Sequence, residues 1–391
     1  MITFFTLFGI VLLLVAMHPF VTYPLSLRFL PDRESGGRDA HDGTTNLDTH
    51  KPHTFAICMC AYNEEKVIEA KMRNLLALRE REPGLEILVY VDNASDRTAE
   101  LLAPYADRIT LHVATERHGK THGMNLLVAK ATASIIVFTD ANVMLDMEAL
   151  DRLRPYFADP QTGCVCGNLI YTNADQSITA ASGSIYWRLE EYIKRQEQRS
   201  GSIMGADGSL FAIRRSLHSS PPDHIIDDMY VSFMILCAGY RILQATDVRA
   251  YEESASNSQE EFRRKVRIAC QAFNVHRLIW PHLRKLDALT LYKYLSHKLV
   301  RWFTIYFLVA SGLSFSLALA LAGWHWAALA LVISAPLALY VGARWSVPAL
   351  SRISDIVLAL TGVGIGVWRS IRGDLFQTWT PATSARNSVQ G

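Results

Sequence analysis

The chain has 391 residues, of which 50% are hydrophobic and 19% are charged, and its formal net charge is +2. The apolar content excludes a disordered chain, and the near balance of charge argues against nucleic-acid binding driven by net charge. The length allows two or three domains or one large one, and charged residues are scarce at both ends of the chain.

The first 27 residues contain no Asp, Glu, Lys or Arg. A membrane-spanning helix needs about 20 apolar residues, which the stretch from residue 2 to residue 21 supplies. This stretch has neither the basic start nor the small-residue cleavage site of a signal peptide. Residues 1–27 are therefore predicted to be an uncleaved membrane anchor. Arg28, Arg33 and Arg38 follow it, so the positive-inside rule predicts that the next domain is cytoplasmic.

A polar segment rich in Gly, Asp, Thr and His makes residues 28–53 a predicted linker. A regular alternation of predicted strands and helices follows. Apolar runs predict strands at 55–60, 86–91, 108–114 and 134–139, and helical patterns lie between them at 64–81, 98–105 and 121–131. This spacing predicts βαβ units and a parallel sheet covered on both faces. Ligands of such sheets lie beyond the carboxyl ends of the strands, so the residues after each strand are the candidate site.

Four of the six cysteines form two C-x-C pairs, Cys58 with Cys60 and Cys164 with Cys166. Each pair lies in an apolar, strand-like run, where this spacing puts both thiols on one face. Zinc sites usually use C-x-x-C with further ligands nearby. We therefore predict buried, reduced thiols rather than a metal site, which also suits a cytoplasmic domain.

Acidic and amide side chains follow three of the four predicted strands. A helix-capping role explains Asp96 well, but it explains Asp92 and Asp140 less well because these two end strands. Asp140 and Asn142, two residues apart, offer oxygen ligands of the kind that Mg²⁺ or Mn²⁺ prefers, and such ions are usually shared with substrate phosphates. The ends of the strands thus predict a ligand-binding edge of the sheet.

Two charged clusters lie further along the chain. Asp227 and Asp228 are adjacent carboxylates that raise each other's pKa by repulsion, which makes one of them a candidate general base, with an acidic helix cap as the alternative. Residues 263–267 form a basic cluster at helical spacing. This cluster is either a solvated helix face or a clamp for a diphosphate, for which the bidentate geometry of Arg is suited.

The C-terminal third contains a second uncharged stretch, residues 302–343, which is long enough for two spans with a turn at 322–325. The basic residues at both of its ends then lie on the cytoplasmic side. A third apolar patch, residues 356–368, favours a re-entrant or interfacial helix over a span because it is shorter than a membrane is thick. Residues 285–301 mix basic and apolar side chains and predict an amphipathic helix on the membrane surface.

The order of these motifs resembles that of the membrane-bound family 2 glycosyltransferases, over about residues 54–280. The resemblance implies an α/β domain of GT-A fold, with a Rossmann-like, mostly parallel sheet and flanking helices, plus N-terminal and C-terminal transmembrane helices. The predicted divisions of the chain are a 1–27 anchor, a 28–53 linker, a 54–284 cytoplasmic glycosyltransferase domain, a 285–301 interface helix, a 302–372 membrane region and a 373–391 tail.

Three segments, AYNEE, DNASDRT and HGKTHGMN, are similar to those with which the family binds its nucleotide. Asp92 falls where the family has an aspartate that reads uracil, and Gly123 stands where the family usually has Ala. The nucleotide-binding residues that the resemblance implies are Ala61, Tyr62, Glu64, Asp92, Lys120 and Asn125.

TDAN is similar to the family's D-x-D metal motif and implies Asp140 and Asn142 as ligands of Mg²⁺ or Mn²⁺, with a neutral Asn in place of the second Asp. The pair Asp227-Asp228 is similar to the family's Glu-Asp pair. It implies that Asp228 is the catalytic base and that Asp227 lies in the substrate site.

Arg264 and Arg267 occupy the place of the Q-x-x-R-W motif of processive polysaccharide synthases and are implied to assist the leaving diphosphate. Only Arg267 matches this motif, because Arg264 occupies the position of its Gln and Ile268 the position of its Trp. This departure from the motif counts against processive synthesis. The implied reaction is an inverting, metal-dependent transfer of a sugar, with a UDP-sugar as the expected donor. The implied acceptor is lipid-linked or a glycan, at the cytoplasmic face of the inner or plasma membrane, in the assembly of a bacterial polysaccharide or envelope glycan.

Three other functions are alternatives to this one. A processive polysaccharide synthase stays open. A transporter or channel component with a regulatory nucleotide-binding domain would need ionisable groups inside its spans, and the paired spans offer only His325. A non-catalytic scaffold is expected to lack the acidic residue at position 140 or at position 228, whereas Asp140 and Asp228 are both present. The expected partners are a nucleotide-sugar, the acceptor, membrane lipid and, for export, a partner subunit; nucleic acid is not expected.

Overall fold

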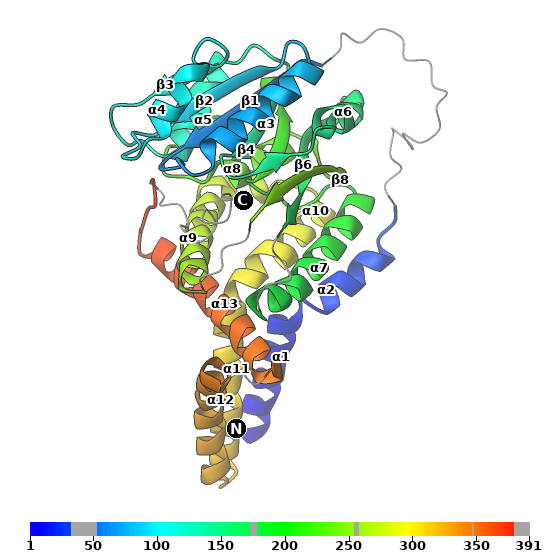
Figure 1. The fold of residues 1–391 in the computed structure, drawn as a ribbon. Coiled ribbons are helices and arrows are strands. Elements are labelled where there is room, and N and C mark those ends of the chain that lie inside the picture. Colours follow the sequence, from blue (N-terminus) through cyan, green and yellow to red (C-terminus); the bar gives the residue numbers. More distant parts are fainter. Residues whose placement is uncertain (33–52, 173–177, 254–257, 346–347, 379–391) are drawn as a thin grey trace.

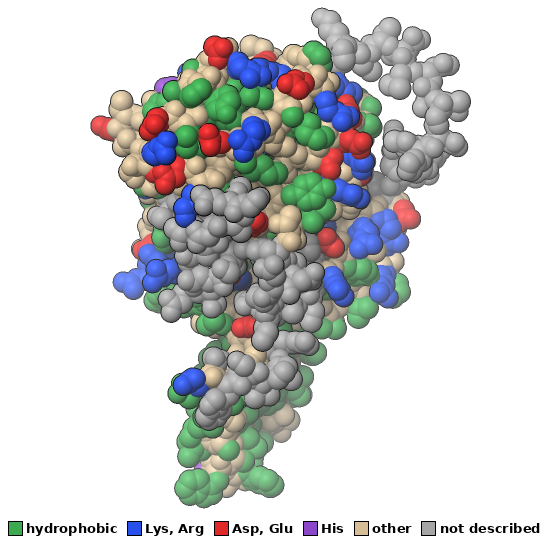
Figure 2. Space-filling model, in the orientation of Figure 1, with side chains coloured by type: hydrophobic (Ala, Val, Ile, Leu, Met, Phe, Trp, Pro, Cys, Tyr) green, Lys and Arg blue, Asp and Glu red, His purple; other side chains and the backbone are tan. Residues whose placement is uncertain are grey.

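The computed structural model describes residues 1–32, 53–172, 178–253, 258–345 and 348–378. Most of the predicted linker and of the predicted tail lies outside these ranges. An α/β domain stands on a column of apolar helices, and the N-terminus lies in that column (Figure 1). Charged side chains gather on the α/β domain, whereas the visible face of the column is mostly hydrophobic (Figure 2).

A single eight-stranded sheet forms the centre of the α/β domain. Its strands are β1 (Phe55–Ala61), β2 (Glu86–Val91), β3 (Thr110–Val113), β4 (Ile135–Asp140), β5 (Met144–Leu145), β6 (Thr162–Tyr171), β7 (Leu210–Arg214) and β8 (Arg241–Glu252). Their spatial order is β3-β2-β1-β4-β7-β6-β8-β5. The strands β3, β2, β1 and β4 are parallel neighbours, and β7 runs antiparallel to both β4 and β6. The four predicted strands and their parallel pairing are thus confirmed.

Helices cover both faces of the sheet (Figure 1). They are α3 (Ile68–Arg81), α4 (Thr98–Leu102), α5 (Lys120–Lys130), α6 (Ala149–Leu153), α7 (Ile178–Arg199), α8 (Asp227–Cys237) and α9 (Ser258–Leu283). The helix predicted from residue 64 begins only at Ile68. The reason is that the backbone N–H of Glu64 donates to the Thr98 hydroxyl at 2.8 Å, and that of Glu65 donates to Asp96 at 3.0 Å. These bonds join the end of β1 to the loop after β2.

Alternate residues of β1 pack into two separate cores, because successive side chains of a strand point to opposite faces. Cys58 and Cys60 lie in the core on the α5 and α8 side, whereas Ile57 and Met59 lie in the core on the α3 and α6 side. All four cysteines of the C-x-C pairs are buried and free. Their predicted burial as packing residues is confirmed, and burial raises the pKa of the Cys58 thiol.

Gly123 on α5 has no room for a side chain, because a methyl group there would overlap the Tyr90 ring and the Cys60 sulfur. This crowding accounts for Gly in a place where the resemblance suggests Ala. We expect Gly123→Ala to lower the free energy of unfolding by about 1–3 kcal/mol, although Ala favours helices by about 1 kcal/mol. The control is Gly312→Ala, since open space surrounds that helical glycine. Equal melting temperatures for Gly123→Ala and the wild type would contradict this prediction.

Within the described ranges, three helical segments are long and apolar enough to cross a membrane, at 288–321, 325–342 and 353–371. The helices concerned are α10 (Ala288–Tyr294), a π-helical turn (Leu295–Leu299), α11 (Val300–Leu321), α12 (His325–Trp345) and α13 (Pro348–Ile371). At the N-terminus, α1 (Ile2–Met17) and the helical segment Thr22–Phe29 count as a fourth span only if the pair, bent by 63°, is taken as one. Length and composition are the basis of these assignments.

The two spans predicted within residues 302–343 correspond to α11 and α12. The third apolar patch, for which a re-entrant helix and a third helix both stayed open, belongs to a helix of 24 residues, because α13 begins well before the apolar patch. This helix is therefore long enough to cross a membrane. The predicted interface helix is continuous with α11 through the π-helical turn.

Three glycines of α13, spaced G-x-G-x-G at 362–366, allow close packing. Gly362 lies against Phe262 of α9, and Gly366 lies against the backbone of Val266. Gly364 faces α11, where Ile305 leaves no room for a Cβ. The packing places α13 directly behind the α9 segment that carries the basic cluster, and so connects the apolar helices to the α/β domain.

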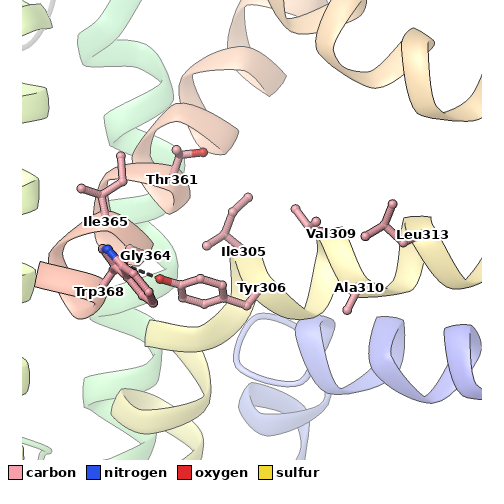
Figure 3. A pocket seen from close by; sticks show the side chains of 9 residues that line it. All are labelled: Ile305, Tyr306, Val309, Ala310, Leu313, Thr361, Gly364, Ile365 and Trp368. Atoms are coloured by element: carbon pink, nitrogen blue, oxygen red, sulfur yellow. Dashed lines mark hydrogen bonds between the residues drawn. The ribbon is translucent and has the colours of Figure 1, made fainter. Parts of the chain in front are cut away.

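A groove of about 520 Å³ lies between α11 and α13. It is lined by Ile305, Tyr306, Val309, Ala310, Leu313, Thr361, Gly364, Ile365 and Trp368 (Figure 3). The Tyr306 hydroxyl donates to the Gly364 carbonyl at 2.8 Å, which leaves an almost wholly apolar lining. Such a lining is typical of a helix surface that faces lipid tails.

Candidate active site

The Asp92 carboxylate organises the loop before α5. This side chain is fully buried and accepts hydrogen bonds from the backbone N–H groups of His118 at 2.8 Å and Gly119 at 3.1 Å. Arg117 lies 3.6 Å from the same carboxylate, and its guanidinium stacks on the Tyr62 ring at 3.5 Å. Gly119 has a φ of +93°, a conformation that glycine adopts without strain. The contact of Asp92 with uracil stays a prediction.

The other residues predicted for the nucleotide pocket lie beside this loop. The Ala61 carbonyl accepts a hydrogen bond from the N–H of Asp92 at 3.0 Å. Glu64 is buried and follows in the same turn. Asp96 accepts a hydrogen bond from the N–H of Thr98, the first residue of α4, at 2.9 Å, although the N-cap residue of this helix is Arg97 rather than Asp96. The ends of β1 and β2 thus meet beside the loop that precedes α5.

Lys120 joins the nucleotide loop to the predicted metal motif, because its ammonium lies 2.6 Å from the Asp140 carboxylate. Burial alone would lower the pKa of Lys120, but the carboxylates of Asp140, Asp227 and Asp228 outweigh burial and raise it. The same ammonium therefore interacts electrostatically with both the predicted metal motif and the predicted base. The three carboxylates are thus grouped around the Lys120 ammonium.

Asn142 donates a hydrogen bond to Glu252 at 2.9 Å, which an Asp in its place could not do. Asp140 and Asn142 still offer two hard oxygen donors, so the donor set fits Mg²⁺ or Mn²⁺. Within the described residues, no three His, Cys, Asp or Glu side chains converge as a complete metal site. Any ion held here would take further ligands from elsewhere, as Mg²⁺ commonly does from phosphates.

Two side chains of α5 hold the loop that leads to the second acidic motif. The Thr121 hydroxyl donates to the Ile225 carbonyl at 2.6 Å, and the Asn125 amide donates to the Pro221 carbonyl at 2.8 Å. Asn125, predicted to seat the nucleotide, is thus engaged with the protein backbone. Its direct role in nucleotide binding stays a prediction.

Asp227 and Asp228 form the first turn of α8. Asp227 is 4% exposed, and among the described residues its Oδ2 has no hydrogen-bond partner. Burial, and then repulsion by Asp227, raises the pKa of Asp228 to about 7. Repulsion alone was expected, and burial is the larger cause. The lack of a side chain at Gly208 makes room for the Asp228 carboxylate, because a Cβ there would meet its Oδ2.

The basic cluster on α9 divides into two parts. Lys265 pairs with Glu261 at 2.5 Å and Arg263 is exposed, so these two follow the solvated-face interpretation. Arg264 and Arg267 both interact electrostatically with Asp140. Burial and the neighbouring Arg264 lower the pKa of Arg267. The fields of these two guanidinium groups and of Asp140 thus overlap.

The sequence did not identify several polar residues that lie near the predicted site residues. Arg117 and Glu252 hold predicted site residues, and Lys194 pairs with Asp207 beside Gly208. Lys71 is a buried lysine behind the metal motif. Its position on the apolar face of a predicted helix was a signal, since lysine is almost never fully buried without a partner.

A C-terminal strap, residues 374–377, runs back from α13 to the nucleotide loop (Figure 1). Its first carbonyl accepts a hydrogen bond from Asn274 of α9 at 3.1 Å. At its other end, the Gln377 amide donates to the His118 carbonyl at 3.0 Å, and the Gln377 carbonyl lies directly over Gly119. The strap therefore covers His118 and Gly119, in the loop that precedes α5.

Residues 56–220 match glycosyl transferase family 2. The poly-β-1,6-N-acetyl-D-glucosamine synthase of Staphylococcus aureus (strain COL) is 27% identical over 209 residues, which cover 50% of this chain and 48% of the relative. The synthase of the same name from Staphylococcus epidermidis is 23% identical over 198 residues, which cover 48% and 47%. The chain spans about half the length of the curated relatives it matches.

A solved structure, the mannosyltransferase PcManGT from Pyrobaculum calidifontis in complex with GDP-Man and Mn²⁺, has the same fold. Its TM-score is 0.68 at 20% identity, over 95% of this chain and 99% of that one. The match to family 2 and the sheet with its flanking helices agree with the resemblance seen in the motifs. The segment 56–220 is therefore a glycosyltransferase domain that matches family 2, and the α/β domain that contains it has a GT-A-like fold.

Proposed function

We propose that the protein is an inverting, metal-dependent transferase that moves a sugar from a nucleotide-sugar, with a UDP-sugar as the expected donor. One observation supports this proposal above the others. The Lys120 ammonium forms an ion pair with Asp140 at 2.6 Å and also interacts electrostatically with Asp227 and Asp228. The diphosphate site and the base site are thereby neighbours. Ala61, Tyr62, Glu64 and Asp92, with Asn125, form the proposed nucleotide pocket.

The residues divide the reaction between them. Asp228 accepts the proton of the acceptor hydroxyl as that oxygen attacks the anomeric carbon, and the bond to the diphosphate breaks in the same displacement. Lys120, Arg264 and Arg267 hold the leaving diphosphate. Asp140 and Asn142 would hold a divalent cation, which supplies neutralisation of the developing charge when bound.

We place the acceptor at the cytoplasmic face of the inner or plasma membrane. The basic residues that flank the candidate spans support this orientation. Close packing of α13 on α9 supports a cleft beside the membrane surface, where a lipid-linked or growing glycan acceptor is available. Assembly of a bacterial polysaccharide or envelope glycan is the expected setting.

A processive polysaccharide synthase is the second candidate. The names of the curated relatives favour it. Against it, those relatives share about half their length with this chain, and Ile268, in the place of the family's Trp, is 38% exposed. A single transfer is therefore the first choice.

The test is a donor panel on the purified full chain. Release of nucleoside diphosphate is followed for UDP-sugars and GDP-sugars with Mg²⁺, with Mn²⁺ and with a chelator. We expect release from a UDP-sugar that the chelator abolishes and added Mn²⁺ restores. Mass spectrometry of the product separates one added sugar from a ladder. Absence of release from every donor would refute the proposed reaction, and release in excess chelator would refute its metal dependence.

A further inference from the structure

Lys71 of α3 is a polar residue in an apolar environment. It is 0% exposed, and Ile68, Met72 and Leu75 of the same helix face are buried with it. Burying an amine or ammonium is costly unless it is paired, and an apolar side chain at this position would pack at lower cost. Such a departure from local preference commonly marks a functional site.

The partners of Lys71 flank the metal motif on both sides. Its Nζ donates to the Thr139 hydroxyl at 3.2 Å and to the Val143 carbonyl. Thr139 immediately precedes Asp140, and Val143 immediately follows Asn142. One nitrogen atom thus ties both ends of the Asp-Ala-Asn turn to α3.

A second residue of α3 extends this attachment. Asn74 lies three positions after Lys71 and therefore on the same side of the helix. Its side chain donates to the Leu145 carbonyl at 2.8 Å and accepts from the Leu145 N–H at 3.0 Å. The segment 139–145 is held along its length by one helix, from the side opposite to Lys120.

We propose that Lys71 is a positioning residue, whose buried nitrogen fixes the turn in which Asp140 and Asn142 meet the divalent cation and the donor diphosphate. The inference rests on the proposed function for its metal, but the attachment of the turn is independent of it. Groups that orient metal ligands from behind typically contribute 10- to 100-fold in metal affinity or activity.

The test compares Lys71→Met with Lys293→Met. Lys293 is a matched control because it is 1% exposed and its Nζ also donates to main-chain carbonyls, those of Glu197 and Ser200, each at 3.0 Å. Both variants are expected to lose stability. Only Lys71→Met is expected to bind Mn²⁺ with UDP about 10- to 100-fold more weakly than the wild type, and to speed amide hydrogen exchange in residues 139–145. Electron paramagnetic resonance of Mn²⁺ and exchange mass spectrometry measure the two effects.

Thr139→Val serves if Lys71→Met does not fold, since it removes one of the two acceptors and should change both readouts in the same direction. Unchanged exchange in residues 139–145 overturns the proposal, and so does faster exchange with wild-type binding of Mn²⁺ and UDP. Failure of the wild type to bind Mn²⁺ with UDP refutes the proposed function instead. In that case, the exchange measurement still decides whether Lys71 holds the turn.

Discussion

The Asp228→Asn variant is expected to bind UDP as the wild type does and to transfer sugar at least about 10²-fold more slowly. The amide keeps the size of the side chain at the start of α8, but it cannot take a proton from the acceptor hydroxyl. A general base contributes about 10²- to 10⁴-fold, or about 3 to 5 kcal/mol of the activation barrier. Calorimetry with UDP and a turnover assay measure both quantities on one preparation.

A surface carboxylate provides the control for this variant. Asp151 is 60% exposed and pairs with Arg81 at 3.5 Å, so Asp151→Asn should keep both UDP binding and turnover. Turnover of Asp228→Asn near that of the wild type would refute the assignment of the base. Loss of UDP binding in Asp228→Asn would show that the residue serves the donor instead.

The raised pKa of Asp228, about 7, adds a pH dependence to this prediction. Below that pH the carboxylate is protonated, so kcat/KM of the wild type should rise with pH and level off above neutrality. The folded state disfavours ionisation of this group. Asp228 therefore costs stability as the pH rises through 7, and Asp228→Asn should unfold at the same temperature as the wild type or a higher one above neutral pH.

Asp140→Asn is expected to impair donor binding and turnover together. The change removes the charge that pairs with Lys120 and one of the two proposed oxygen ligands of the cation. Electrostatic stabilisation by a metal amounts to several kcal/mol, so kcat/KM should fall by at least about 10²-fold. Titration of the Mn²⁺ requirement and calorimetry with UDP check this expectation.

The contrast between the two variants carries the test. Asp228→Asn should lower kcat with UDP binding intact, whereas Asp140→Asn should also weaken UDP and raise the Mn²⁺ concentration needed for half-maximal rate. Equal Mn²⁺ requirements in Asp140→Asn and the wild type would remove Asp140 from the metal site.

The sequence predicted the parts of the fold that depend on local pattern. Four continuous apolar runs became β1 to β4, and their parallel order followed from the helices between them. The acidic residues after β2 and β4 could be placed on one edge of the sheet for the same reason. The local role of Asp96 at the start of α4 could be predicted from residue type, but the N-cap position falls one residue later, at Arg97.

The remaining features depend on contacts between distant segments. Asn142 is held by Glu252 and the Asp140 turn by Lys71, and no spacing rule relates residues so far apart. The strand β5 has two residues, too few for a period to be recognised. The length of α13 was underestimated because its first part is not continuously apolar.

The C-terminal strap has a mechanical consequence. It connects a helix long enough to lie across a bilayer to the main chain of the donor loop, through the bond between Gln377 and His118. A thinner or thicker bilayer changes the tilt of such a helix. If α13 lies across a bilayer, a change in membrane thickness would therefore act on the backbone of His118 and Gly119, in the loop that we propose receives the nucleotide.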